Sequence, residues 1–181
     1  MTENELSELL QSGENIPIMA RYFTDHPELL PALMNIAADD RENSTWRAFW
    51  IADKIHEQQP DLIVPFLPAI TDLALTTQNS SKKRHLLKLI SLHDIPPERM
   101  APLLNFCLDL FTNAMEAVAV RVHAMQILFN IALKEPEFTG ELADLIEHEI
   151  EYFGSAGISS RGRKLLRELR KIGKPGQSKR Q

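Results

Sequence analysis

The amino-acid sequence predicts an all-α fold of stacked helical hairpins, and three observations indicate it. A proline followed by a carboxylate recurs four times, at steps of 33, 37 and 39 residues, and an arginine follows each dipeptide at steps of 37, 37 and 40 residues. A repeat of this length is typical of two-helix units that stack on one another. Apolar residues after each proline recur at i, i+3/4 and i+7, which is the period of a helix. Glycine is scarce before Gly154, and no β-hairpin signal appears.

Each proline–acid dipeptide predicts the start of the first helix of a pair. Proline at the first helical position has no N–H to lose, and the acid beside it faces the positive end of the helix dipole. The dipeptides and the arginines that follow them are Pro27-Glu28 with Arg47, Pro60-Asp61 with Arg84, Pro97-Glu98 with Arg121, and Pro136-Glu137 with Arg161.

The arginines lie on the predicted second helices, which we place at 45–56, 82–92, 116–134 and 159–172. Polar loops at 39–44 and 78–81 separate the two members of a pair and supply capping residues. Two shorter helices, near 5–11 and 18–23, are expected to cap the amino-terminal end. The prediction is one domain over residues 1–172, with a cap at 1–25, about four hairpin repeats at 26–172, and a flexible basic tail at 173–181.

Composition and charge argue for a soluble chain without a generic attraction to nucleic acid. The 181 residues are 44% hydrophobic and carry a net charge of -5. The charge is uneven, because residues 158–181 hold nine Lys/Arg and one Glu. The acidic amino terminus lacks the plan of a secretory signal, and no apolar run is long enough to cross a bilayer. We therefore expect a cytoplasmic protein that does not bind membranes.

The segment Val120-Arg121-Val122-His123-Ala124 resembles the second helix of HEAT repeats, in which an apolar residue, an arginine and a small residue recur. Trp46–Trp50 and Lys83–Leu87 fit the same frame with larger residues, and Lys83 replaces the apolar residue. The resemblance covers about residues 26–172. It implies an αα-superhelix of the HEAT/armadillo kind, with second helices lining a concave face that binds partner proteins.

The arginine register gives the candidate binding site. On a helical wheel the residues near each arginine include further cations and a methionine, so the second helices are expected to present a ladder of positive charge. Its members are Arg47, Lys54, Arg84, Lys88, Arg121, Met125 and Arg161. A ladder of this kind suits an acidic or extended protein partner, with nucleic acid as the second choice. The alternative is a structural role, in which the arginines bind helix ends or the carboxylates of Asp40, Glu42 and Glu116.

Two further segments allow a functional and a structural interpretation. The basic run 161–171 looks like a segment that binds nucleic acid or a membrane surface, but the acidic helix before it favours a solvated capping helix with opposed charges. Tyr152 and Phe153 are expected to pack against Leu165 and Leu169 in that last hairpin, although exposed apolar repeat ends would instead allow dimerisation.

Trp46, Trp50 and Asp53 raise the possibility of a HEAT-like DNA alkylation repair glycosylase. That family uses aromatic residues and an aspartate on a basic concave face. The repeat frame instead places both tryptophans in the core and leaves only Asp53 near the surface. The acidity of the chain also argues against a DNA-embracing enzyme.

No metal, cofactor or catalytic motif is present. The six histidines form no HExxH pattern or Cys/His cluster, and Cys107 occupies a repeated apolar position typical of a small core residue. The sequence therefore predicts a non-enzymatic interaction module or scaffold. The alternative is a DNA-binding or glycosylase-type protein, and the oligomeric state stays open.

Overall fold

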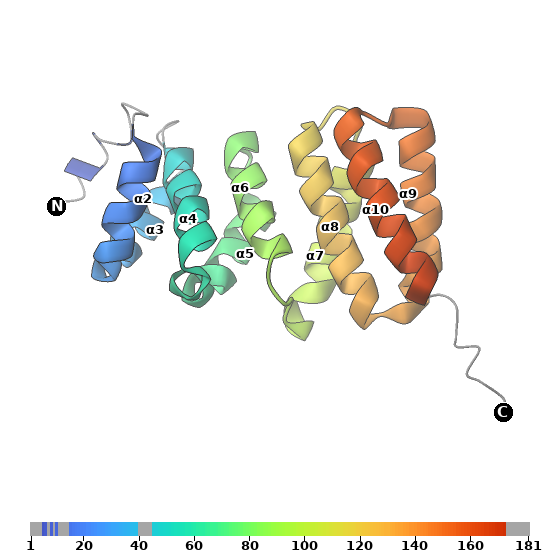
Figure 1. Ribbon diagram of the computed structural model, residues 1–181, viewed down its shortest axis with the longest axis horizontal. Helices are drawn as coiled ribbons and strands as arrows, with labels where there is room; N and C mark the ends of the chain where they lie inside the picture. Colours follow the sequence, from blue (N-terminus) through green and yellow to red (C-terminus); the bar gives the residue numbers. More distant parts are fainter. Residues whose placement is uncertain (1–4, 7, 9, 11–14, 40–44, 173–181) are drawn as a thin grey trace. The chain divides into compact units, whose positions relative to one another are not determined.

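The computed structural model describes residues 5, 6, 8, 10, 15–39 and 45–172 (Figure 1). Every regular element within these ranges is a helix, so the all-α prediction is confirmed. The chain divides into two compact units, an amino-terminal unit (Met1–Leu92) and a carboxy-terminal unit (His93–Gln181). The single domain over 1–172 and the number of repeats stay predictions.

The amino-terminal unit is a set of helical hairpins whose second helices pack on one another. Its α-helices are α2 (Ile16–Asp25), α3 (Leu30–Ala38), α4 (Trp46–Gln58), α5 (Leu67–Thr76) and α6 (Ser80–Ser91). Short 3-10 turns, η1 (Pro27–Leu29), η3 (Pro60–Leu62) and η4 (Val64–Phe66), precede α3 and α5. Helix α4 packs against α2, α3 and α6, and α5 packs against α6. The unit thus contains the hairpins α3/α4 and α5/α6, as the two-helix repeat predicts.

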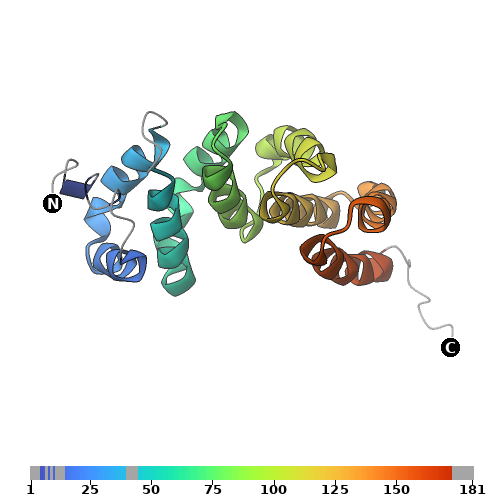
Figure 2. The same cartoon turned by 90° about the horizontal axis from the view of Figure 1, so that it is seen from above.

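The carboxy-terminal unit repeats this plan with longer helices. They are α7 (Pro97–Thr112), α8 (Val118–Lys134), α9 (Thr139–Phe153) and α10 (Ala156–Ile172), with the 3-10 turn η5 (Pro136–Phe138) before α9. Helix α8 packs against α7, α9 and α10, and α9 packs against α10 (Figure 2). Consecutive hairpins are therefore stacked in register within the unit.

The four proline–acid dipeptides do start the first helices, with one correction. Three of them open with a 3-10 turn, and only Pro97 begins an α-helix directly. The Pro27 carbonyl accepts from the Leu30 N–H, because Pro31 has no N–H to offer at the α-helical distance. The Val64 carbonyl accepts from Leu67 for the same reason, since Pro68 is the fourth residue after it. A second proline thus accounts for η1 before α3 and for η4 before α5, but not for η3 or η5, in which the fourth residue after the proline is Val64 or Gly140.

The predicted second helices are present, with ends shifted by at most three residues. Helix α6 begins at Ser80 because the Asn79 side chain accepts from the N–H groups of Ser81 and Lys82. This confirms the 78–81 loop as a source of capping residues. Much of the 39–44 loop, with Asp40 and Glu42, lies outside the described residues, as does the 173–181 tail. The expected 5–11 helix is described only in part, and Leu6 and Leu10 within it are buried.

Apolar side chains at the helical period fill the core of each unit. Phe23, Leu33 and Phe49 are fully buried in the amino-terminal unit. Complete burial of such a side chain contributes about 1.5–3 kcal/mol. Cys107 of α7 is fully buried in the carboxy-terminal unit, and burial raises the pKa of its thiol. The expectation that Cys107 is a small core residue is confirmed.

In the part of the chain that the structure describes, no helix has the length and apolar character needed to span a membrane.

Candidate functional site

Arg121 of α8 is a structural residue. Its side chain is 3% exposed, its Nε donates to the Phe111 carbonyl near the end of α7 at 2.9 Å, and its Nη2 donates to Glu149 Oε2 on α9 at 2.5 Å. It therefore ties three helices of the carboxy-terminal unit together. Met125 is also fully buried. The expected exposure of Arg121 and Met125 on a binding face is wrong, and the structural alternative is confirmed for Arg121, with Glu149 as its carboxylate.

Arg47 also has a structural bond, to the backbone of the amino-terminal cap. Its Nη1 donates to the Leu10 carbonyl at 2.7 Å, and its Cζ lies 5.5 Å from the centre of the Trp46 ring. The guanidinium remains half-buried rather than enclosed. Arg47 thus combines a capping role with partial access to solvent.

Lys82 is a structural cation that the sequence analysis missed. It is completely buried, and its Nζ donates to the Asp39 carbonyl at the carboxyl end of α3, at 2.7 Å. Arg84, two residues later, is exposed and makes no hydrogen bond or ion pair with the described residues. Lys82 therefore does in α6 what Arg121 does in α8. A search for either a lysine or an arginine in the first turn of α6 would have identified Lys82 as the structural cation.

Helices α4 and α6 of the amino-terminal unit share a cationic surface. We call it the α4–α6 face and define it by Arg47, Trp50 and Lys54 of α4 with Arg84 and Lys88 of α6. Four of the seven predicted site residues thus lie in this unit, whereas Arg121, Met125 and Arg161 belong to the carboxy-terminal unit.

A network of ion pairs joins the two helices of the α4–α6 face. The Lys88 ammonium lies 2.7 Å and 2.8 Å from the two carboxylate oxygens of Asp53, and 3.1 Å from Glu57 Oε1. Lys54 donates to Glu57 Oε2 at 2.6 Å. Glu57 therefore bridges the two lysines and holds them on the same surface.

Asp53 is the buried anchor of this network. Its side chain is 5% exposed, so the expected position near the surface is wrong. Burial acts to raise the pKa of Asp53, but His85 and Lys88 beside the carboxylate outweigh it and hold the pKa below its usual 3.8. Burial likewise acts to lower the pKa of Lys88, and Asp53 and Glu57 outweigh it and keep the pKa above its usual 10.5. Both directions favour the charged forms of Asp53 and Lys88.

Three aromatic rings lie beside this ion pair. Trp46 and Trp50 stack on each other, with ring centres 5.8 Å apart, and His85 of α6 stacks on both at 6.0 Å and 6.3 Å. The two tryptophans are half-buried rather than fully enclosed in the core, which corrects the expectation for them. His85 Nδ1 lies 3.5 Å from Asp53 Oδ2, too far for a well-formed hydrogen bond. The three rings therefore form a stack beside the cations, in which the two tryptophans are partly exposed.

In the carboxy-terminal unit, Arg161 of α10 donates to Gln126 Oε1 of α8 at 2.8 Å. Arg170 pairs with Glu147 of α9 at 2.6 Å, as expected for opposed charges in the last hairpin. Tyr152 and Phe153 are exposed, so their expected burial against α10 is wrong. Among the described residues no group of three or more potential ligands is placed to hold a metal ion.

A family model described as a HEAT repeat domain matches residues 2–169, which confirms the resemblance seen around Arg121. Comparison with the curated proteins and with the solved structures gives no match.

Proposed function

Because the chain belongs to the HEAT repeat family, we propose that it is a non-enzymatic protein-interaction module that binds an acidic partner segment on the α4–α6 face. Proteins built from stacked helical hairpins present long rigid surfaces, which suits a scaffold better than a catalytic pocket. The cytoplasmic location expected from the sequence stays a prediction.

The observation that carries the proposal is the state of Arg84. Its guanidinium is exposed and makes no hydrogen bond or ion pair with the described residues, whereas the structural cation of the same helix is Lys82. Arginine and tryptophan, which both lie on the α4–α6 face, are among the residue types enriched at the centres of protein interfaces.

The surrounding charges favour an anionic partner. The four cations of the face outnumber the carboxylates of Asp53 and Glu57, and Asp53 is buried beneath the surface. Lys54 and Lys88 are held in place by Glu57 before a partner arrives, so little side-chain entropy is lost on binding. An acidic segment would therefore meet a preorganised positive surface.

Intrinsic fluorescence offers a direct test, because both tryptophans of the chain lie on α4. We expect titration with an oligo-glutamate peptide to change the tryptophan emission in a salt-dependent manner. The double variant Arg84→Glu with Lys54→Gln should weaken this binding by about tenfold or more, since charge reversal replaces an attraction by a repulsion. Circular dichroism should show an unchanged fold, because neither side chain is buried.

A matched control is the double variant Arg163→Glu with Lys164→Glu on α10, which changes two exposed charges outside the α4–α6 face and should leave the fluorescence titration as it was. Equal binding by the Arg84/Lys54 variant and the native chain would contradict the proposed face.

A second titration, with DNA, distinguishes our proposal from the DNA-binding alternative. Labelled duplex DNA at low and moderate salt should bind weakly, because the chain carries a net charge of -5. The Asp53 carboxylate is occupied by Lys88, which leaves it poorly placed to act on a flipped base. Tight, steeply salt-dependent DNA binding, without binding of the peptide, would replace our proposal by that alternative.

A further inference from the structure

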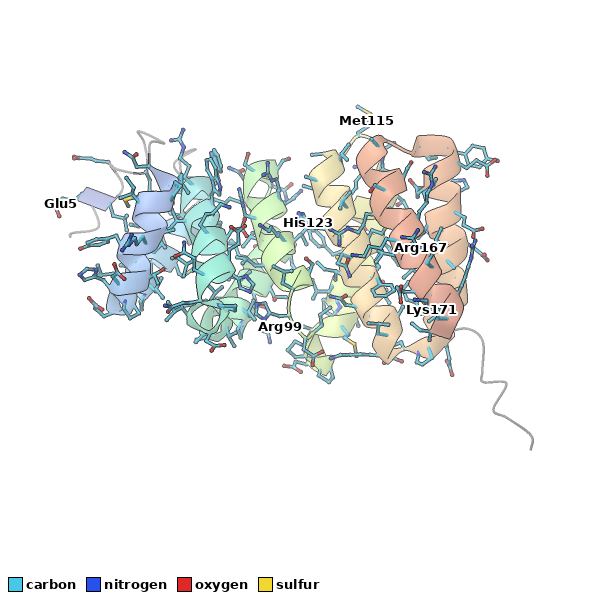
Figure 3. The ribbon with its side chains drawn as sticks, viewed as in Figure 1. Glu5, Arg99, Met115, His123, Arg167 and Lys171 are labelled. Carbon is cyan, nitrogen blue, oxygen red and sulfur yellow. The ribbon has the colours of Figure 1, made fainter. Side chains whose placement is uncertain are left out.

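Helix α10 has a buried apolar row and a basic row on the opposite side. Its buried residues are Ile158, Gly162, Leu165, Leu166 and Leu169. The exposed cations form what we call the α10 basic strip, which consists of Arg163, Lys164, Arg167 and Lys171. Figure 3 labels two of them, Arg167 and Lys171, about one helical turn apart on α10.

The strip is largely unneutralised. Arg163, Lys164 and Arg167 make no hydrogen bond or ion pair with the described residues. Among the residues that the structure describes, Lys171 pairs only with Glu168 of its own helix, at 2.9 Å. Three neighbouring like charges repel one another in the free protein, and an anionic partner would relieve that repulsion.

The flanks of α10 already contact the two neighbouring helices of its unit. On one flank Arg170 pairs with Glu147 of the acidic helix α9, and on the other Arg161 contacts the neutral Gln126 of α8. Cations on one face of a helix recur every three or four residues, or about 5–6 Å, and carboxylates at i, i+3/4 and i+7 on a second helix recur at the same distance. The Arg170–Glu147 pair is a single contact of this kind between α10 and an acidic helix.

We propose that the α10 basic strip is a docking site for an acidic helix of a partner protein, with carboxylates at i, i+3/4 and i+7. The site lies on a different helix and in a different unit from the α4–α6 face, and it does not depend on the function proposed for that face. The strip is bordered on α10 by Arg161 and Arg170, which already contact side chains of α8 and α9.

Long polyanions fit the strip less well than a single helix does. The exposed face of α9, which packs beside α10, carries Glu141, Asp144, Glu147 and Glu151. Duplex DNA or an anionic membrane would bring its phosphates near these carboxylates as well as near the cations, because either surface is wider than one helix. A helix lying along α10 touches the strip and avoids most of the acids.

The experiment is a titration of the full chain with a fluorescently labelled helical peptide that carries glutamates at i, i+4 and i+7, followed by anisotropy. A peptide of the same composition with its glutamates spread around the helix is the control for spacing. We expect the first peptide to bind at least several-fold more tightly, and the difference to shrink as salt rises from about 0.01 M to about 0.15 M.

The variant Arg163→Glu/Lys164→Glu/Arg167→Glu should weaken binding of the first peptide by roughly tenfold or more, since each exposed pair contributes a modest amount and reversal adds repulsion. The charge-conserving variant Arg163→Lys/Arg167→Lys should bind within a few-fold of the native chain. Each titration is repeated with Arg84→Glu and Lys54→Gln in place, so that peptide bound at the α4–α6 face does not mask binding at the strip. Should the triple variant fail to fold by circular dichroism, the single variant Arg167→Glu gives the same comparison.

Three results would overturn the proposal. The first is equal binding of the two peptides, and the second is tighter binding of duplex DNA or of phosphatidylserine vesicles that depends on the strip. The third is self-association of the native chain that the triple variant abolishes, because the strip would then serve a second copy. Failure of this site leaves the fluorescence titration on α4 unaffected, so the two proposals can fail separately.

Discussion

Replacing Glu149 with leucine should lower the free energy of unfolding of the carboxy-terminal unit by about 3–5 kcal/mol. Glu149 and Arg121 are 2% and 3% exposed, so the substitution leaves a guanidinium buried without its carboxylate. The remaining bond, from Arg121 Nε to the Phe111 carbonyl, satisfies a hydrogen but does not neutralise the charge. Urea unfolding followed by far-ultraviolet circular dichroism measures the loss.

The double variant Glu149→Leu/Arg121→Met is the matched control. It removes both charges and should regain much of the lost stability, because apolar residues of similar size often replace a buried ion pair at little cost. A residual deficit of about 1–3 kcal/mol is expected, since the Phe111 carbonyl then lacks its donor. A single substitution that costs less than about 1 kcal/mol would show that Arg121 is not held as the structure has it.

The architecture could be predicted because its signals are local. Proline at a first helical position, an acid beside it and an apolar stripe each act within one or two turns, so they mark Pro27, Pro60, Pro97 and Pro136 without knowledge of the fold. The 3-10 turns η1 and η4 were missed although their cause is equally local. Pro31 and Pro68 each remove the N–H that the first α-helical turn would need.

The site was predicted less well because burial of a charged residue is decided by distant partners. Spacing alone made Arg84 the equivalent of Arg121, but the carbonyl of Asp39 is bonded by Lys82, and Arg84 is left exposed. Arg121 is enclosed because Glu149, 28 residues later, lies against it. A helical wheel places side chains on a face, but it does not say which face a neighbouring helix covers.

Asp53 and the two tryptophans show the same limitation, because the predicted buried and exposed positions are exchanged. The repeat frame placed the rings in the core and Asp53 outside, whereas α6 covers Asp53 and leaves Trp46 and Trp50 half-buried. The register of α6 against α4 sets this outcome, because Lys88 and His85 must reach Asp53. The four cations of the α4–α6 face remain partly or fully exposed, and their role in binding stays a prediction.

Replacing Lys88 with methionine should lower the free energy of unfolding of the amino-terminal unit by about 2–3 kcal/mol near neutral pH. The carboxylate of Asp53 would then be buried without its cation. We expect less than the loss for a fully enclosed pair, because the Lys88 side chain is 30% exposed and water can take its place. Urea unfolding followed by the emission of Trp46 and Trp50, which stack on His85 beside Asp53, measures the loss.

The stability deficit of Lys88→Met should depend on pH, and the pKa of Asp53 sets the direction of that dependence. In the native chain the pKa of Asp53 is below 3.8, so its stabilising contribution is present above that value and is lost as the pH falls below it. Without Lys88 burial dominates, and the pKa of Asp53 should rise above 3.8. The variant then loses stability as the pH rises through this range, so its deficit relative to the native chain should shrink on acidification from about pH 7 to about pH 3.5. Adding Asp53→Asn to Lys88→Met should abolish most of that pH dependence. If the deficit of Lys88→Met is instead constant with pH, packing of the lysine stem, rather than the Asp53 charge, links α4 to α6.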